Sequence, residues 1–148
     1  MTTTVLVRDA TSADVSALAA LLDELGYPVE SHALAPRVES LLSSPDNHVL
    51  VATRAGEPSS PIGLLSLHVR PVIHDAGDLA MIMALVITKT ARGEGVGRVL
   101  IERAAVVARE HGARRLFVTT HLRRLDAHAF YERLGFEFTG RRYVKALG

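Results

Sequence analysis

Several features are missing from this sequence, and each absence excludes a class of function. It contains no cysteine, which excludes disulfides and thiolate chemistry. No apolar run reaches the roughly 18 residues that a membrane-spanning helix needs. Neither charge predominates, because 17 basic residues face 16 acidic ones, so we expect neither nucleic acid nor a membrane as a partner. The opening residues MTTTVLVRD lack the apolar core of a signal peptide, so we expect a cytoplasmic protein.

The residues that are present predict one globular domain over residues 1–148, because hydrophobic residues make up 48% of the chain. Thr11 and Asp14 form a capping-box pattern, and Gly26 is placed to end the helix that follows. Further helices are expected through 34–42, where Pro36 leaves the start open because proline suits only a first turn, through 96–107 and through 127–134. The expected strands are Val5–Val7 with Arg8, His48–Thr53, Ile62–Val69 with Gly63 as a bulge, Ala80–Ile87, Arg115–Thr120, one through Phe136 and Phe138, and Arg141–Lys145.

The stretch Arg92-Gly93-Glu94-Gly95-Val96-Gly97 joins an apolar strand and a short polar turn to a long amphipathic helix. Glycines let the backbone approach a ligand closely, and the first turn of a helix leaves N–H groups unpaired at the positive end of its dipole. This order of elements predicts an anion site. It is not a Walker loop, because Arg98-Val99 stand where that motif needs Lys and Ser or Thr, and its glycines do not follow the dinucleotide spacing. A glycine-rich turn without a ligand is the alternative.

A second pattern lies near the C-terminus, in Ala127-His128-Ala129-Phe130-Tyr131-Glu132-Arg133-Leu134-Gly135-Phe136. Its apolar positions share one helical face, and Gly135 is placed where a left-handed cap would stand. Tyr131 is the residue with chemical potential, because a phenol with a pKa of about 10 can donate a proton without being ionised at neutral pH. The alternative is a packed aromatic side chain with no chemical role.

The two patterns together resemble the GNAT family of N-acetyltransferases. Residues 92–97 match its acetyl-CoA loop, Arg/Gln-x-x-Gly-x-Gly/Ala, and residues 127–136 match its A-x-x-F-Y-x-x-x-G-F motif. The resemblance covers about 80–145 and implies an α/β fold, α+β in some schemes. It implies a mixed, mostly antiparallel sheet of six to seven strands, splayed at its centre, with helices on both faces.

The resemblance also implies a cosubstrate site for acetyl-CoA, with no metal. The residues implied to hold the pyrophosphate are Arg92, Gly93, Glu94, Gly95, Val96, Gly97 and Arg98. The backbone of Leu85, Val86 and Ile87 would pair with the pantetheine arm, and an N–H group near Val86 would polarise the thioester carbonyl. Tyr131 would protonate the leaving CoA thiolate.

The sequence departs from the family where many members carry an acid on the central strand. Met81 stands at that position, so the common general base is missing. Asp78, His74, Asp75 and His121 are the candidates nearby, and His68 and His74 are weaker candidates than His121. The family's asparagine before the second motif is replaced by Arg124, which would bind a phosphate or an acidic acceptor, or only face solvent.

The resemblance implies direct transfer of an acetyl group from acetyl-CoA to a primary amine. The missing acid leaves a second interpretation open, a non-catalytic acyl-CoA-binding or regulatory module. The acceptor pocket is expected around 31–37, 71–78 and 121. Amino acids, polyamines, aminoglycosides, peptide N-termini and protein lysines remain open as acceptors. Homodimers are frequent in the family, but the sequence shows no interface.

Overall fold

A computed structural model describes residues 4–119, 125–140 and 142–148, and the side chains of 125 and 126 lie outside that description. The chain divides into two compact units, Met1–Phe117 and Val118–Gly148. That one domain spans 1–148 therefore stays a prediction.

A five-stranded sheet in the order β1-β2-β3-β4-β5 is the framework of the first unit. Its strands are β1 (Val5–Asp9), β2 (Asn47–Arg54), β3 (Gly63–Arg70), β4 (Asp78–Ile87) and β5 (Ala113–Val118), the last residue of which belongs to the second unit. The first four strands pair antiparallel with their neighbours. The starts of β4 and β5 are joined, because the N–H of Asp78 donates to the carbonyl of Gly112 at 3.1 Å. This contact fits the parallel pair expected of two strands connected through a helix.

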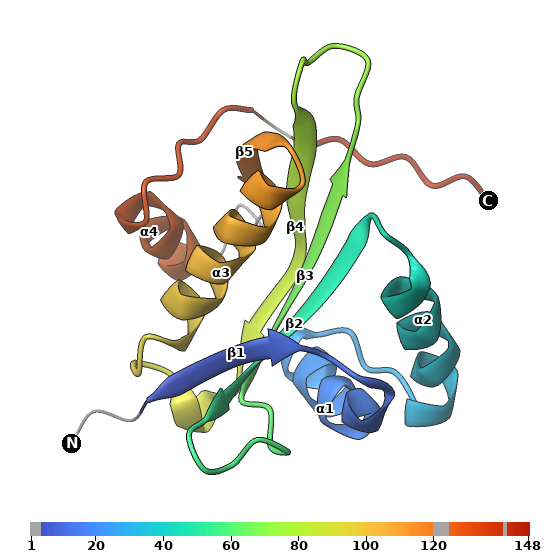
Figure 1. Cartoon of the computed structure of the whole chain (residues 1–148), viewed down its shortest axis with the longest axis vertical. Coiled ribbons are helices and arrows are strands. Elements are labelled where there is room, and N and C mark those ends of the chain that lie inside the picture. Colours follow the sequence, from blue (N-terminus) through green and yellow to red (C-terminus); the bar gives the residue numbers. More distant parts are fainter. Residues whose placement is uncertain (1–3, 120–124, 141) are drawn as a thin grey trace. The chain divides into compact units, whose positions relative to one another are not determined.

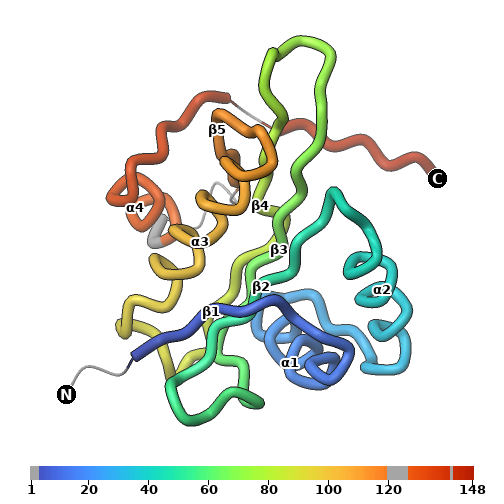
Figure 2. The backbone as a smooth tube through the Cα atoms, viewed as in Figure 1, coloured from blue at the N-terminus to red at the C-terminus, as the bar shows by residue number. Residues whose placement is uncertain are grey.

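Helices cover both faces of this sheet. α1 (Val15–Leu25) and α2 (Ser31–Ser43) lie on one side of the strands, and α3 (Val96–Glu110) lies on the other (Figures 1 and 2). The core under α1 and α2 joins Leu18, Leu21, Leu34 and Val38 to Val49, Val51, Leu64 and Val86 of the strands. On the α3 face, Val96, Leu100 and Ala104 are buried at helical spacing.

The local signals at the first helix are confirmed. The Thr11 hydroxyl accepts a hydrogen bond from the N–H of Ala13, and Asp14 accepts one from the N–H of Thr11, so the capping box is complete. It caps a short 3₁₀ turn, η1 (Ser12–Asp14), which leads directly into α1. Gly26 ends α1 with a φ of 103°. Pro36, however, lies inside α2 rather than in its first turn, because α2 already begins at Ser31. Its ring is exposed, so water can satisfy the carbonyl that proline leaves without a donor.

The expected bulge at Gly63 is wrong, and the irregularity lies in β4 instead. The register passes from Ser66 opposite Ala84 to Leu67 opposite Ile82, which leaves Met83 as an extra residue. Gly63 serves close packing: a Cβ there would lie 3.0 Å from Leu100 Cδ1. Glycine in a strand commonly indicates either a bulge or the close approach of another element. At Gly63 the second reason applies, because α3 packs closely against β3.

The expected six to seven strands are not matched, because the described residues contain five. Neither the strand through Phe136 and Phe138 nor the strand over 141–145 is present in the described residues 136–140 and 142–148. Phe138, Tyr143 and Val144 are 74%, 88% and 75% exposed, so no neighbouring element covers them. Alternating apolar residues make a segment suitable for a strand, but a strand also needs a partner for its backbone.

The second unit contains α4 (Leu125–Arg133) and an extended segment after it. Gly135, with a φ of 90°, ends the helix as expected, and the N–H of Phe136 donates to the carbonyl of Tyr131 at 3.1 Å. The sequence therefore predicted both the helix and its glycine cap.

Candidate active site

The loop between β4 and α3 has the backbone that its glycines predict. A short 3₁₀ turn, η2 (Lys89–Ala91), leads into it, and Gly93 and Gly95 adopt φ angles of 85° and 79°. These values lie in the left-handed region, where a side chain costs about 1–2 kcal/mol. A Cβ at either glycine would have no atom within 4 Å, so both positions border open space.

The same loop presents N–H groups that no other part of the described chain uses. Gly95 caps α3 without a side-chain hydrogen bond, and the first bond into the helix runs from the N–H of Val99 to the carbonyl of Gly95 at 3.2 Å. The N–H groups of Gly93, Gly95, Val96, Gly97 and Arg98 have no partner among the described residues, whereas that of Glu94 makes a long 3.4 Å bond to Ala91. A cluster of unpaired donors at a helix N-terminus is suited to an anion with several oxygens.

The charged side chains of the loop make contacts of different kinds. Arg92 is exposed, with its Nε 3.4 Å from the carbonyl oxygen of Ile87. Arg98 pairs with Glu102 one turn along α3 at 3.1 Å, where both side chains are exposed. An exposed pair of this kind contributes little to stability, so both arginines can turn toward a ligand at small cost.

Two further residues brace the loop, and no sequence pattern pointed to either. Arg54, at the end of β2, holds the carboxylate of Glu94 with bonds of 2.9 and 3.4 Å. Glu24, near the end of α1, accepts hydrogen bonds from the Thr88 hydroxyl at 2.8 Å and the Lys89 N–H at 3.0 Å. The Thr88 bond is the main cause that holds the pKa of Glu24 below its ordinary value. These pairs are 40 and 64 residues apart in sequence, so only the fold brings them together.

The strand residues proposed for the pantetheine arm lie at the C-terminal end of β4. This end of β4 is paired with the start of β3: Leu85 stands opposite Leu65, Val86 opposite Leu64 and Ile87 opposite Gly63. One edge of β4 is thus already used at these positions, and pairing of the pantetheine with the other edge stays a prediction.

Met81 is half-buried on β4, and its register partner on β3 is His68. The bulge residue Met83 is 63% exposed, although the strand around it is mostly covered. Bulges occur often beside active sites, where they re-aim the backbone or a side chain. The central strand is therefore irregular close to the position where no carboxylate is available.

Asp75, Asp78 and His74, three candidates for the base, differ in their surroundings. Asp75 forms an ion pair with Arg115 and accepts a 2.8 Å hydrogen bond from its guanidinium group. This hydrogen bond is the main cause that lowers the pKa of Asp75. A carboxyl that is held ionised in this way is a weak proton acceptor. Asp78 is half-buried at the start of β4, and His74 is exposed in the preceding loop. His121 lies outside the described residues.

Tyr131 lies in α4, in the second unit, whereas the glycine loop belongs to the first. The tyrosine ring contacts Phe130 and Phe136 edge to face, with centroids 5.3 and 5.6 Å apart. The helix and the glycine cap fix the backbone of this residue, as the motif predicts. Its role as proton donor stays a prediction, and Arg124 lies outside the described residues.

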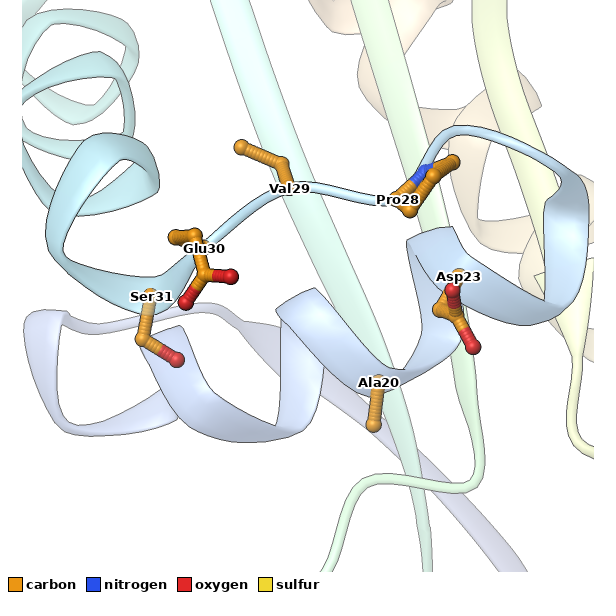
Figure 3. Close-up of a pocket in the computed structure, with 6 residues that line it drawn as sticks. All are labelled: Ala20, Asp23, Pro28, Val29, Glu30 and Ser31. Atoms are coloured by element: carbon orange, nitrogen blue, oxygen red, sulfur yellow. The ribbon is translucent and has the colours of Figure 1, made fainter.

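A shallow hollow of about 440 Å³ lies between the end of α1 and the start of α2. Figure 3 shows Glu30 and Ser31 at one end of it and Asp23 at the other. A second hollow of about 460 Å³ is lined by Pro36, Arg37, Ser40 and Leu41. Both hollows border the region 31–37 that the sequence predicts to shape the acceptor pocket. Among the described residues, no group of three His, Asp or Glu side chains could hold a metal ion, and no helix is long and apolar enough to cross a membrane.

Comparison with known proteins gives consistent matches. A family model of the acetyltransferase (GNAT) family matches residues 15–136. The aminoalkylphosphonate N-acetyltransferase of Salmonella typhimurium is 33% identical over 142 residues, which is 95% of this chain and 90% of that protein. An uncharacterized N-acetyltransferase of Chlorobaculum tepidum is 29% identical over 137 residues, which is 93% of this chain and 78% of that protein.

Solved structures share the fold. A transcriptional regulator from Bacillus halodurans superposes with a TM-score of 0.88 at 24% identity, over 97% of this chain and all of that one. An aminoglycoside N-acetyltransferase in complex with CoA superposes with a TM-score of 0.85 at 18% identity, over 97% of this chain and 95% of that one. At these identities the likeness concerns the fold alone.

Proposed function

The chain belongs to the GNAT acetyltransferase family, and on that premise we propose that it transfers an acetyl group from acetyl-CoA to a primary amine of a small molecule. The glycine loop is the observation that carries the proposal. Its unpaired N–H groups at the start of α3 border open space, and the two left-handed glycines keep that space free of side chains.

The residues of the loop fit the diphosphate of acetyl-CoA. The N–H groups at 93–97 would donate to its oxygens, and Arg92 and Arg98 would add charge-assisted hydrogen bonds. Glu94 is the exception, because its side chain is acidic. The ion pair with Arg54 neutralises that carboxylate and holds it, which makes an acid tolerable in this loop. The backbone of 85–87 would extend the site along the pantetheine arm.

The proposed chemistry is direct attack of the amine on the thioester. Holding the two reactants together removes much of the entropic part of the barrier. An N–H group near Val86 would stabilise the oxyanion of the tetrahedral intermediate. Tyr131 would give its proton to the leaving sulfur, since a phenol is protonated at neutral pH.

The acceptor that we propose is a small amine with an anionic group. The Salmonella relative is an aminoalkylphosphonate N-acetyltransferase, and it matches this chain over 95% of its length. The hollow at Asp23 and Glu30 carries two carboxylates, so it suits the ammonium end of a substrate better than the phosphonate. Aminoalkylphosphonates are therefore the first acceptors to test, with polyamines and aminoglycosides as cationic comparisons.

The experiment measures release of free CoA from acetyl-CoA with a panel of these amines, together with CoA binding by calorimetry. Steady, amine-dependent release supports the enzyme, and the acceptor with the highest kcat/KM identifies the substrate class. Tight binding without turnover for any amine would instead support a non-catalytic acyl-CoA-binding module, an alternative motivated by the absence of a carboxylate at Met81. A protein that binds no CoA would refute both.

A further inference from the structure

The proposed reaction needs a group that accepts a proton from the amine, and β4 carries none beyond its first residue, Asp78. Residues 79–87 of that strand are all apolar. The neighbouring strand β3 does carry such a group, because His68 stands opposite Met81 in the register. Side chains of directly paired residues project from the same face of a sheet, with Cβ atoms about 4.5–5.5 Å apart. The imidazole of His68 therefore lies beside the central strand on the face covered by α1 and α2.

A chain of hydrogen bonds sets the tautomer of this histidine. The side-chain amide of Asn47 donates from Nδ2 to the Ser44 hydroxyl at 3.0 Å, which leaves Oδ1 as its acceptor. That oxygen lies 2.9 Å from Nδ1 of His68. Nδ1 must then carry the hydrogen, and the lone pair of the neutral ring is on Nε2. This is the arrangement of a base that is oriented by a third group.

The opposite nitrogen of the ring is available. Nε2 of His68 has no hydrogen-bond partner among the described residues, and the side chain is half-buried, so it is held in place and still accessible. Two other histidines of the first unit, His48 and His111, have ring nitrogens in different surroundings. His48 Nε2 is buried without a partner beside the His111 ring, and Nδ1 of His111 bonds to the Val107 carbonyl.

We propose that His68 is the general base of the acetyl transfer, with Asn47 as its positioning residue. This inference rests on the proposed function. Nε2 takes one proton from the ammonium group of the acceptor, directly or through one water, which leaves the nitrogen lone pair free. The C–N bond then forms and the C–S bond breaks. The second proton lost by the nitrogen balances the proton that the leaving sulfur gains, so one proton is released overall.

The surroundings of His68 are compatible with this role. The helix side chains packed on the same face include Leu18, Leu21, Leu34 and Val38, which are apolar. The charged residues nearest in sequence and register are Arg70, two positions along β3, and Asp46, beside Asn47. The bulge at Met83, just beyond the register pair, further marks this part of β4 as irregular.

The test compares His68→Gln, His68→Ala and Asn47→Ala with the unaltered protein, using the best acceptor of the amine panel. Both His68 variants should lower kcat about 10²–10⁴-fold, the usual effect of losing a general base, while the affinity for CoA stays the same. Asn47→Ala should give a smaller loss that falls on kcat rather than KM. The acidic limb of the pH profile of kcat/KM should disappear in His68→Gln, apart from any contribution of the acceptor itself.

Imidazole rescue separates a chemical role from a structural one. Added imidazole should restore turnover to His68→Ala and should not restore it to Tyr131→Phe. Full turnover in both His68 variants, or loss of the acidic limb in His74→Ala instead, would overturn the inference and leave the acetyltransferase proposal standing. An unaltered protein that binds CoA but acetylates no amine would overturn both proposals.

Discussion

Replacement of Gly95 by alanine separates the cost of an unusual backbone from the loss of a ligand contact. Gly95 has a φ of 79°, and a Cβ there would meet no atom within 4 Å, so the folded protein suffers no clash. The remaining penalty is that of an L-residue in the left-handed region, about 1–2 kcal/mol. For a chain of this size that corresponds to a fall in Tm of roughly 2–8 °C.

Gly112 provides the matched control, because it lies at the opposite end of α3. Its φ is 89°, and a Cβ there would lie 3.9 Å from Asp78 Cγ, which is ordinary contact. Gly112→Ala should therefore lower Tm by a similar amount and leave CoA binding unchanged. Gly95→Ala should in addition place a methyl group over the N–H cluster. Loss of one charge-assisted hydrogen bond, about 1.5–3 kcal/mol, would weaken CoA binding about 10- to 150-fold.

Calorimetric titration with CoA and thermal unfolding of both variants supply the four quantities needed. We expect equal changes in Tm and unequal changes in affinity. Similar loss of affinity in both variants would show that the effect is general destabilisation. Native affinity in Gly95→Ala would show that the diphosphate is not bound at this loop.

Three more predictions test contacts elsewhere in the protein. Tyr131→Phe should lower kcat about 10²–10⁴-fold with CoA affinity retained, and unchanged turnover would remove Tyr131 from the mechanism. Arg54→Met should weaken CoA binding roughly fivefold to tenfold, because the freed Glu94 carboxylate competes with CoA for the N–H groups of the glycine loop. Adding Glu94→Gln to this variant should restore CoA affinity, and unrestored affinity would show that the Glu94 carboxylate is not the competitor. Asp14 is held ionised chiefly by the hydrogen bond from Arg8, which lowers the pKa of Asp14. The pKa of Asp14 is therefore lower in the folded state than in the unfolded state, where it is about 4. The stabilisation is present at neutral pH and is lost in acid, because the unfolded state takes up a proton at a higher pH than the folded state does. Asp14→Asn should cost about 1.5–3 kcal/mol at pH 7 and flatten the acid limb of urea-unfolding stability against pH, whereas an unaltered limb would refute the assignment.

The sequence alone determined the features that depend on a few neighbouring residues. Thr11 and Asp14 are three residues apart, so the capping box was readable from their types. Gly93, Gly95 and Gly135 adopt the left-handed angles that only glycine takes at little cost, so the loop and the end of α4 followed from the glycine pattern. Such features need no information about the rest of the chain.

Tertiary structure decided everything that depends on pairing across long sequence separations. The bulge at Met83 exists only because β3 and β4 pair in a particular register, and nothing in the apolar run 79–87 distinguishes that residue. The residues 136–148 have a strand-like pattern, yet their described part has no strand, because a strand needs a partner that local sequence cannot supply. Arg54 meets Glu94 and Asn47 meets His68 for a related reason: the packing and register of distant segments, rather than residue type, bring those side chains within reach.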